Sequence, residues 1–349
     1  MPRIGFYTQI VNERGTSGAL FDYARHHQAA EPGGAVVLYN RNDPHNLPEA
    51  LERARRQFDV IPCDRAEAVE AAGKAAGCEA LYVIKVGWPD ALMPKDLPMM
   101  VHAVFGKATS AVHGASYAFV SEWLSQFCTG GRVPFVPHIC TIGSNDDDMR
   151  AELGIPEEAF VLGSYGGSTS FDVPFVRETI PALLEERSDL WLIFMNIPEF
   201  VAHPRVRFLP GSMDVAVKTA FINTSNAMLH ARRIGETFGL AVGEFALRGK
   251  PVLTWSGSRD RAHLAMLGET ALRYGNAEEL IGLVARMTGN EPHAAEVYRR
   301  FTPEPVMAAF RDRLLEPALR NGPNGARQAL GLKPWHALRF GLARAGLLK

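Results

Sequence analysis

The chain has 349 residues, enough for about two domains, and its composition of 47% apolar and 21% charged residues is that of an ordinary globular protein. This composition excludes intrinsic disorder, collagen-like repeats and a small disulfide-stabilised scaffold. The 37 basic and 38 acidic side chains leave a formal net charge of −1, so the chain as a whole lacks the positive charge with which proteins bind nucleic acid.

The cysteines are scattered and form no C-x-x-C pair, which excludes a zinc ribbon and a dithiol redox motif. We expect all four, Cys63, Cys78, Cys128 and Cys140, to be reduced, buried thiols. The first residues run into a predicted strand without the regions of a signal peptide, and no apolar run approaches the roughly 18 residues of a membrane span. We therefore expect a cytoplasmic protein.

The first half of the chain alternates short β-branched or aromatic runs with longer amphipathic stretches, which is the pattern of βαβ units and a parallel sheet. Apolar runs such as residues 81–84 are typical of strands covered on both faces. The predicted strands are residues 4–7, 35–39, 58–61, 80–84, 99–105 and 117–121. The predicted helices between them are residues 18–28, 47–57 and 66–76.

A segment with two prolines, residues 132–139, is predicted to be extended because Pro134 and Pro137 do not fit inside a helix. We interpret it as the crossing between two domains. The α/β pattern then restarts with a helix opened by residues 146–148. Further strands are predicted over residues 160–164, 191–196, 206–209, 227–230, 252–254 and 270–274.

These elements predict an α/β protein with two Rossmann-like domains that face each other across a cleft. The first domain spans residues 1–138 and the second spans residues 139–310, and residues 311–349 form C-terminal helices that cross back to the first domain. Ligands of doubly wound sheets bind beyond the carboxyl ends of the strands, so the predicted site lies in the cleft.

The most informative stretch is residues 233–254, in which Glu236 and Glu244 are eight positions apart. Glu236 lies in a glycine-bracketed loop, and Glu244 lies inside a helix predicted over residues 240–248. The start of this helix, at Gly239, offers unpaired backbone N–H groups and the positive end of the helix dipole, which favour a phosphate. The two carboxylates are suited to accept hydrogen bonds from the hydroxyl groups of a sugar and a ribose.

This stretch resembles the retaining glycosyltransferases of the GT-B fold, above all the large family four, whose signature is E-x7-E followed by a small-residue helix and G-x-P-V. The match includes Phe-Gly-Leu after Glu236 and Ala-Leu-Arg-Gly-Lys-Pro-Val after Glu244. The resemblance implies that Glu236 faces the donor sugar and Glu244 the ribose, and that the N–H groups of Phe238, Gly239 and Leu240 bind the sugar and diphosphate. The alternative is an amphipathic helix preceded by a glutamate that complements its dipole.

A second motif is the glycine-rich turn after the strand over residues 160–164, with Gly166, Gly167, Ser168 and Thr169. Such a turn lets backbone N–H groups approach an anion closely. In the family this turn usually carries an Arg and, nearby, a Lys that neutralise the donor diphosphate, and both are missing here. We expect compensation from a loop arginine, because an Arg fork binds phosphate with two hydrogen bonds. Arg232 is slightly favoured over Arg233 because it follows more directly from the end of the strand. An exposed arginine without a ligand is the alternative.

In the first half, Gly15, Thr16 and Ser17 follow the first strand and open a helix. GT-B enzymes commonly use a loop at this position to admit the acceptor and contact the donor phosphate. The family also often places a histidine of the N-terminal domain against the donor sugar, and His102 or His113 is expected in that role. The alternative for both is a histidine satisfied in the core. We expect His138 to be a linker residue facing the cleft.

Two further features receive structural interpretations. The run Asp146, Asp147 and Asp148 reads as D-x-D, a metal-binding mark, but acidic residues are expected in a first helical turn, so we predict no metal. The C-terminal residues 333–349 are basic and carry Trp335, as in segments that lie on an anionic membrane surface. We favour packing of the last helices, over residues 303–319, on the N-terminal domain, with peripheral contact at the inner face of the membrane as the alternative for the tail.

Together these features predict a retaining glycosyltransferase that moves a sugar from a nucleotide-sugar donor to a glycan, lipid-linked or other acceptor, with no cofactor besides the donor. The resemblance implies front-face substitution, in which the departing diphosphate helps to deprotonate the acceptor. The alternative is a nucleotide-sugar-binding or regulatory protein of the same fold without turnover, which the missing cations favour. A nicotinamide-dependent dehydrogenase is disfavoured because residues 163–167 lack G-x-G-x-x-G and the next strand ends at Asn196.

Overall fold

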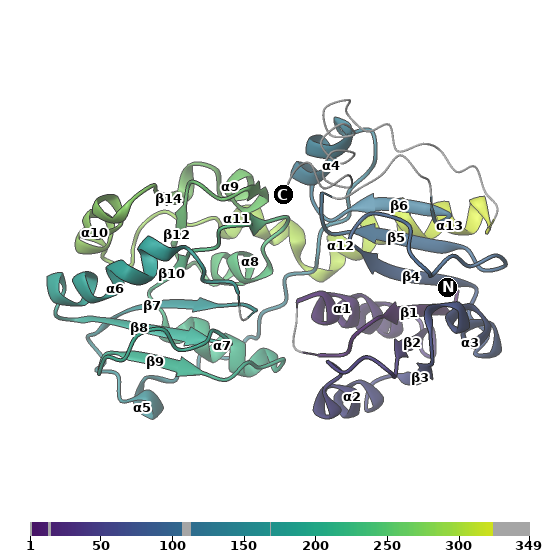
Figure 1. Ribbon diagram of the computed structural model, residues 1–349, viewed down its shortest axis with the longest axis horizontal. Coiled ribbons are helices and arrows are strands. Elements are labelled where there is room, and N and C mark those ends of the chain that lie inside the picture. Colours follow the sequence, from purple (N-terminus) through teal and green to yellow (C-terminus); the bar gives the residue numbers. More distant parts are fainter. Residues whose placement is uncertain (1, 13–14, 107–112, 168, 324–349) are drawn as a thin grey trace. The chain divides into compact units, whose positions relative to one another are not determined.

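The computed structural model describes residues 2–12, 15–106, 113–167 and 169–323. The chain divides into two compact units (Figure 1). The N-terminal unit contains Met1–Ile139 together with the segment from Pro303 onward, and the C-terminal unit contains Cys140–Thr302.

The N-terminal unit is built on a six-stranded parallel sheet in the order β3-β2-β1-β4-β5-β6. Its strands are β1 (Ile4–Thr8), β2 (Ala35–Asn40), β3 (Asp59–Cys63), β4 (Ala80–Lys85), β5 (Met99–Ala103) and β6 (Ser116–Phe119). Its α-helices are α1 (Gly15–Ala30), α2 (Pro48–Arg55), α3 (Val69–Ala75), α4 (Glu122–Thr129), α12 (Pro303–Phe310) and α13 (Glu316–Asn321).

Both faces of this sheet are buried by packed side chains. Successive side chains of each strand point to opposite faces, so every strand contributes to both. Leu81 of β4 packs in a cluster with Val69 of α3 on one face. The next residue, Tyr82, lies on the other face, where its ring centroid is 5.3 Å from that of Tyr23 in α1 and 5.4 Å from that of Phe310 in α12. This arrangement explains the near-continuous apolar pattern of the strands.

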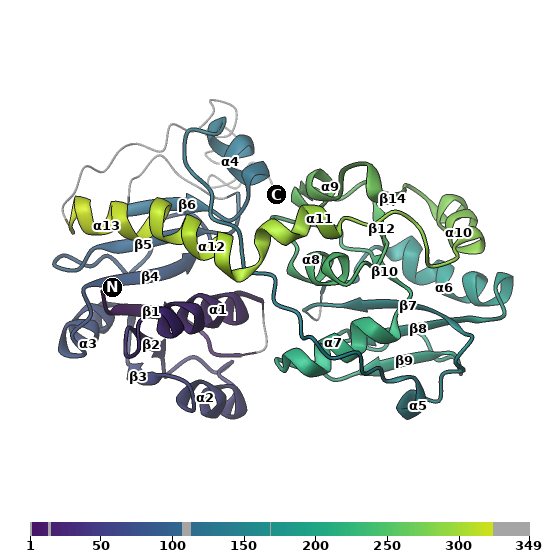
Figure 2. The same cartoon turned by 180° about the vertical axis from the view of Figure 1, so that it is seen from behind.

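The chain returns to the N-terminal unit at Pro303, whereas the sequence analysis placed the end of the second domain at residue 310. The reason is the packing of α12, whose Phe310 ring lies 5.2 Å from Tyr23. Beyond it a π-helical turn, Arg311–Leu315, leads into α13, and Arg313 donates a 2.7 Å hydrogen bond to the carbonyl of Phe135. Figure 2 shows α12 and α13 lying along the sheet beside β4, β5 and β6.

The C-terminal unit has a second six-stranded parallel sheet, in the order β14-β12-β10-β7-β8-β9. Taken in chain order, its strands follow the same third-second-first-fourth-fifth-sixth arrangement as the first sheet. They are β7 (Phe160–Tyr165), β8 (Leu190–Met195), β9 (Val206–Leu209), β10 (Ala227–His230), β12 (Val252–Trp255) and β14 (Ala271–Tyr274). The α-helices are α5 (Arg150–Leu153), α6 (Pro174–Glu186), α7 (Val215–Thr224), α8 (Leu240–Leu247), α9 (Ala262–Leu267), α10 (Ala277–Arg286) and α11 (Ala295–Tyr298).

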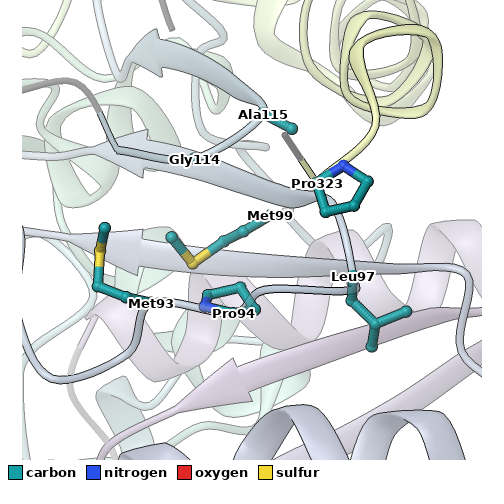
Figure 3. Close-up of a pocket in the computed structure, with 7 residues that line it drawn as sticks. All are labelled: Met93, Pro94, Leu97, Met99, Gly114, Ala115 and Pro323. Atoms are coloured by element: carbon teal, nitrogen blue, oxygen red, sulfur yellow. The ribbon is translucent and has the colours of Figure 1, made fainter. Parts of the chain in front are cut away.

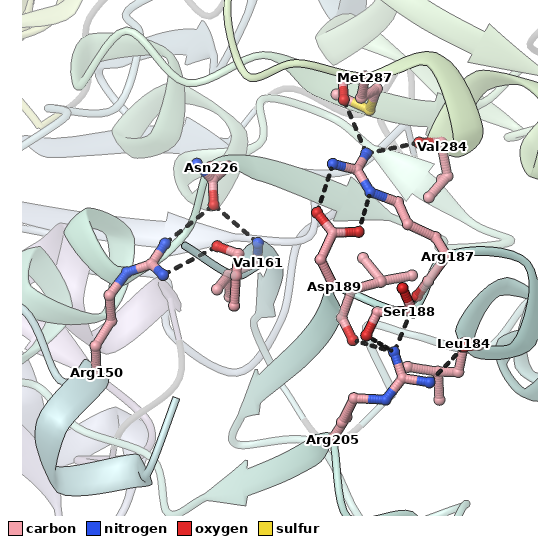
Figure 4. A network of polar contacts seen from close by, with 12 residues as sticks. Arg150, Val161, Leu184, Arg187, Ser188, Asp189, Arg205, Asn226, Val284 and Met287 are labelled. Carbon is pink, nitrogen blue, oxygen red and sulfur yellow. Dashed lines mark hydrogen bonds and ion pairs between the residues drawn. The ribbon is translucent and has the colours of Figure 1, made fainter. Parts of the chain in front are cut away.

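Arginines at the amino-terminal edge of this second sheet close the ends of helices (Figure 4). Arg187 donates to the carbonyl groups of Val284 and Met287, at 2.9 and 2.8 Å, where α10 ends. Arg205 donates to the carbonyl group of Leu184 in the last turn of α6. These guanidinium groups bind carbonyl groups at the carboxyl ends of α6 and α10, where the regular helical hydrogen bonds run out, so their role is structural.

The fold confirms the predicted α/β class with two Rossmann-like sheets. The predicted cleft between the domains stays a prediction. All four cysteines are buried thiols. Within the described ranges, no helix combines the length and the apolarity needed to cross a membrane.

Candidate functional site

The two motifs of the C-terminal unit meet at the middle of its sheet. β7 and β10 are neighbours at the point where the strand order reverses, and in such sheets ligands bind beyond the carboxyl ends of these strands. The loops that follow them are tied together. The Asp172 carboxylate, after the glycine-rich turn, accepts a 2.7 Å hydrogen bond from the N–H of Arg233, and the Asp172 N–H donates to the carbonyl of Ala231 at 2.9 Å.

The loop that carries Glu236 is bent back by a small parallel pairing of β11 (Gly235–Glu236) with β13 (Asp260–Arg261). Gly235 has φ +72°, and a Cβ at this position would lie 2.0 Å from the carbonyl oxygen of Asp260. Only glycine fits such a close approach. The glycine before Glu236 therefore fixes where this carboxylate stands.

The Glu236 carboxylate is held through one oxygen. Its Oε1 accepts a hydrogen bond from Arg232 Nη1 at 2.8 Å and lies 3.5 Å from His230 Nε2. Burial acts to raise the pKa of Glu236, but the His230 hydrogen bond and the Arg232 guanidinium outweigh it and hold the pKa at about 2. The side chain is 19% exposed and is ionised at neutral pH.

Helix α8 starts directly after this loop. Gly239 precedes it in the left-handed region at φ +94°, and among the described residues no side chain caps the helix. The first-turn N–H groups and the positive end of the dipole are thus left for an anion. The ring of Phe238 is buried against Phe301, with centroids 5.3 Å apart, so its side chain anchors the loop.

The second glutamate, Glu244, is buried in α8 and forms an ion pair. Its Oε1 accepts a 2.9 Å hydrogen bond from Lys218 Nζ of α7, 26 residues earlier in the chain. Lys218 is 22% exposed and Glu244 6% exposed on the side chain. Sequence reasoning missed Lys218 because nothing in the spacing links α7 to α8.

The glycine-rich turn is held by a residue from the next strand. Asn196, at the end of β8, donates from Nδ2 to the carbonyl of Gly166 at 2.7 Å. Asn196 itself has φ +58°, a conformation that asparagine tolerates better than most residues. The Ser170 N–H donates to the carbonyl of Gly167 at 2.8 Å, and Thr169 is exposed. Ser168 lies outside the described residues.

Two buried histidines that the sequence analysis did not single out lie under the Glu236 loop. His230 ends β10, and its Nδ1 lies 3.0 Å from Thr254 Oγ1. The His263 ring, in the first turn of α9, lies 4.6 Å from the His230 ring. Burial, and then the neighbouring His230, lower the pKa of His263 to about 3, so this ring is neutral at physiological pH.

The candidate histidines of the N-terminal unit are core residues. His102 is fully buried in β5, with Nδ1 2.7 Å from the Tyr82 hydroxyl and Nε2 2.8 Å from the Val136 carbonyl. Burial lowers its pKa to about 4. His113 is buried with its ring edge-on to Tyr117, and His138 is buried against His102. For His102, both nitrogens are engaged inside the unit, which is the structural alternative of the sequence analysis.

The predicted loop at the start of α1 divides into two parts. Gly15 and Thr16 are exposed at the start of the helix. Ser17 is buried, and its hydroxyl donates a 2.9 Å hydrogen bond to the carbonyl of Ile10 and lies 3.4 Å from the N–H of Asn12. The Ser17 side chain therefore holds the preceding loop, and a ligand contact of the exposed Thr16 stays a prediction.

Two other places, an apolar cavity and the acidic run, lack the grouped side chains of a catalytic or metal site in the described residues. A small cavity of the N-terminal unit is lined by apolar side chains such as Met93 and Leu97, and Met99, the first residue of β5, puts it at the amino-terminal edge of the sheet (Figure 3). In the acidic run, Asp146 forms an ion pair with Arg248 at 3.1 Å. No group of three or more His, Cys, Asp or Glu side chains in the described ranges could hold a metal ion.

A scan against protein-family models and a search of curated proteins find no match to this sequence. Solved structures do match. HepE from Anabaena, in complex with UDP-glucose, has a TM-score of 0.62 and 13% identity over 99% of this chain and 100% of that chain. WaaG, a glycosyltransferase involved in lipopolysaccharide biosynthesis, has a TM-score of 0.54 and 14% identity over 94% and 97% of the two chains.

A protein from Listeria monocytogenes described as a UDP-N-acetylglucosamine 2-epimerase has a TM-score of 0.55 and 13% identity, over 89% of this chain and 96% of that chain. Likenesses at such low identity establish the fold only, and the function has to be inferred from the residues of the site. The chain has the GT-B fold, as the sequence predicted.

Proposed function

We propose that the chain is a retaining glycosyltransferase that takes a sugar from a nucleoside diphosphate sugar and transfers it to a hydroxyl group of a glycan, lipid-linked or other acceptor. The observation that carries the proposal is the pair Glu236 and Glu244 on either side of the N-terminus of α8, at the carboxyl edge where β7 and β10 meet. The E-x7-E resemblance and the GT-B fold support it.

The proposed donor position follows from the contacts of the two glutamates. Glu236 uses Oε1 for Arg232 and His230, and no described residue bonds its Oε2, which we assign to a hydroxyl of the donor sugar. The N–H groups at the start of α8 would bind the diphosphate. Glu244 would accept from the ribose, with Lys218 beside it.

Charge neutralisation must come from outside the glycine-rich turn, since the turn has no Arg or Lys. Arg232 stands in the loop beside it, and we assign to this guanidinium the diphosphate contact that the family gives to its loop cations. Together with the α8 dipole it would stabilise the leaving group without a metal ion.

The Glu236 carboxylate is unsuited to act as a general base. A carboxylate whose pKa is about 2 is a weak base at neutral pH, so Glu236 suits electrostatic stabilisation of the sugar cation. In the proposed step the bond from the anomeric carbon to the diphosphate oxygen breaks. The acceptor oxygen bonds the same face of that carbon, and its proton passes to the departing diphosphate. The anomeric configuration is thereby retained.

A protein that binds a nucleotide sugar without turnover is the second candidate, and the uncharged turn of Gly166 and Gly167 favours it.

We further propose a cytoplasmic protein with peripheral membrane contact through residues 333–349, which lie outside the described residues. Cosedimentation of the full chain with anionic lipid vesicles tests this contact.

Thermal-shift measurements with UDP, GDP, ADP, dTDP and CMP, and with their sugar conjugates, test the donor site. A ligand at 100 times its dissociation constant stabilises by about 2.7 kcal/mol. We expect one nucleotide to shift the wild type, with the shift lost in Glu244→Gln and kept in Glu185→Gln, a matched change of an exposed glutamate on α6. No shift with any nucleotide would refute the donor site.

Turnover separates the two candidates. With the nucleotide sugar so identified and a set of acceptor glycosides, NMR of the product reports transfer and the configuration of the new bond. Retention of the donor configuration supports the proposal, inversion contradicts it, and binding without consumption of donor favours the second candidate. Consumption with inversion at C2 and without acceptor would indicate an epimerase.

A further inference from the structure

Thr254 and His230 face each other in neighbouring strands. In the parallel pair β10 and β12, His230 is in register with Thr254, and the two side chains meet with His230 Nδ1 3.0 Å from Thr254 Oγ1. Thr254 is fully buried, and the His230 ring is nearly so. In such a buried environment a hydrogen bond is strong, and a polar group without a hydrogen-bond partner costs free energy.

Neighbouring residues hold both the backbone and the ring of His230. The backbone carbonyl accepts a 2.8 Å hydrogen bond from the hydroxyl of Tyr274 in β14. The buried ring of His263 lies 4.6 Å away, and Thr254 holds Nδ1. The remaining nitrogen, Nε2, points out of the sheet edge to Oε1 of Glu236 at 3.5 Å.

The chemistry of the partners decides where the ring proton is. An ionised carboxylate only accepts hydrogen bonds, so a contact with Glu236 requires the proton of a neutral His230 on Nε2. Nδ1 is then an acceptor, and the Thr254 hydroxyl, which can donate, is the group that satisfies it.

We propose that Thr254 is a positioning residue for Glu236: its hydroxyl keeps His230 in the tautomer with the proton on Nε2, so that His230 and Arg232 together hold one carboxylate oxygen and leave the other for a ligand. The assignment of that second oxygen to a donor-sugar hydroxyl rests on the proposed function. The arrangement of Thr254, His230 and Glu236 does not, because it is a property of the chain without ligand.

Nitrogen-15 NMR of the histidine rings in the ligand-free full chain tests the tautomer, with the signals of His230 assigned by their loss in His230→Gln. We expect a protonated Nε2 and an unprotonated Nδ1 in the wild type and in Thr254→Ser. Thr254→Val has nearly the same shape but no hydroxyl, and we expect the proton to move to Nδ1 in part or all of the molecules. A wild-type proton on Nδ1, or an unchanged tautomer in Thr254→Val, overturns the proposal.

The carboxylate itself gives a second ligand-free measurement. Carbon-13 titration of Glu236 follows its pKa, which is held at about 2 partly by the His230 hydrogen bond. We expect this pKa to rise in Thr254→Val and to stay in Thr254→Ser. A pKa that does not move in Thr254→Val, although the tautomer changes, overturns the link from His230 to Glu236.

Binding of UDP-glucose as the probe then tests the link to the ligand. Loss of one hydrogen bond predicts a Kd about 2- to 10-fold higher in Thr254→Val, unchanged in Thr254→Ser, and without a further increase when Thr254→Val is added to His230→Gln. A Thr254→Val effect that persists in the His230→Gln background contradicts action through His230. If the wild type does not bind UDP-glucose, the NMR measurements still decide the tautomer, and the binding test is repeated with the nucleotide sugar that the thermal-shift screen identifies. A screen without any hit refutes the donor site and leaves the tautomer result standing.

Discussion

The two sheets share one strand order but use their buried histidines differently. His102 lies inside β5, and both its nitrogens bond groups of its own unit, the Tyr82 hydroxyl and the Val136 carbonyl. His230 is the last residue of β10, and only its Nδ1 faces inward, toward Thr254, while Nε2 faces the loop beyond the strand. The position of a histidine along its strand thus decides whether it serves the core or the ligand edge.

Charged groups show the same contrast. Lys85 ends β4 in the N-terminal unit, and its buried Nζ bonds the Asp90 carboxylate at 2.6 Å and the Leu92 carbonyl at 3.0 Å. Burial lowers the pKa of Lys85, and the ammonium group is used to hold its own loop. At the carboxyl edge of the C-terminal unit, Arg232 and Glu236 pair with each other and remain partly exposed. The second edge therefore keeps a charged pair partly accessible to solvent, as the proposed function requires.

The largest expected effect is at that edge. Glu236→Gln keeps the shape of the side chain but removes the charge that we assign to the sugar cation, so the transfer rate should fall about 100- to 1,000-fold. Glu185→Gln is the control and should keep full activity. A loss of less than about fivefold, measured at saturating donor, would remove Glu236 from the mechanism.

At His102 we expect a loss of stability and no effect on ligand binding. His102→Ala leaves the Tyr82 hydroxyl and the Val136 carbonyl buried without this partner and opens a cavity, which should lower the free energy of unfolding by about 3 kcal/mol in urea titrations. His45→Ala, a change at an exposed ring, should cost less than about 0.5 kcal/mol. The Kd for the nucleotide sugar identified by thermal shift should not change. A higher Kd at unchanged stability would instead restore the sugar contact that the sequence suggested.

Lys218→Met tests the pair beneath the proposed ribose position. The change removes the Lys218 ammonium group from the buried Glu244 carboxylate, and we expect a loss of about 2 kcal/mol in the free energy of unfolding. In the double variant with Glu244→Gln the two losses should be less than additive. Strictly additive losses, measured by urea unfolding of all four proteins, would show that the ion pair does not stabilise the fold.

The smallest effect concerns pH. Because the pKa of Glu236 is about 2 in the fold against an ordinary value of 4.5, this group stabilises the protein above pH 4.5, and the contribution is lost as pH falls toward 2. Between pH 7 and pH 4 the loss is about 1 kcal/mol. Urea titrations at both values should show it in the wild type and in Glu185→Gln, and a smaller decline in Glu236→Gln. Equal declines in all three proteins would contradict the low pKa.

Much of the fold follows from local patterns in the sequence. The predicted strands of both halves lie within a few residues of those observed, because β-branched and aromatic runs buried on both faces have no good alternative to a parallel sheet. Helix α6, Pro174–Glu186, likewise begins at a proline, which suits the first helical turn. Gly239, between Glu236 and Glu244, also predicted where α8 begins, while anion binding at this helix start stays a prediction.

Tertiary structure decided which side chains meet. Lys218 and Glu244 are 26 residues apart, Asn196 and Gly166 are 30 apart, and His230 and Thr254 are 24 apart, and each pair is joined only by neighbouring strands or helices. It also placed His102 in the core and returned the chain to the first unit at Pro303. Local periodicity determines which elements form and which face they bury. The partner of a buried polar group depends on strand order and register, which arise from packing of the whole unit.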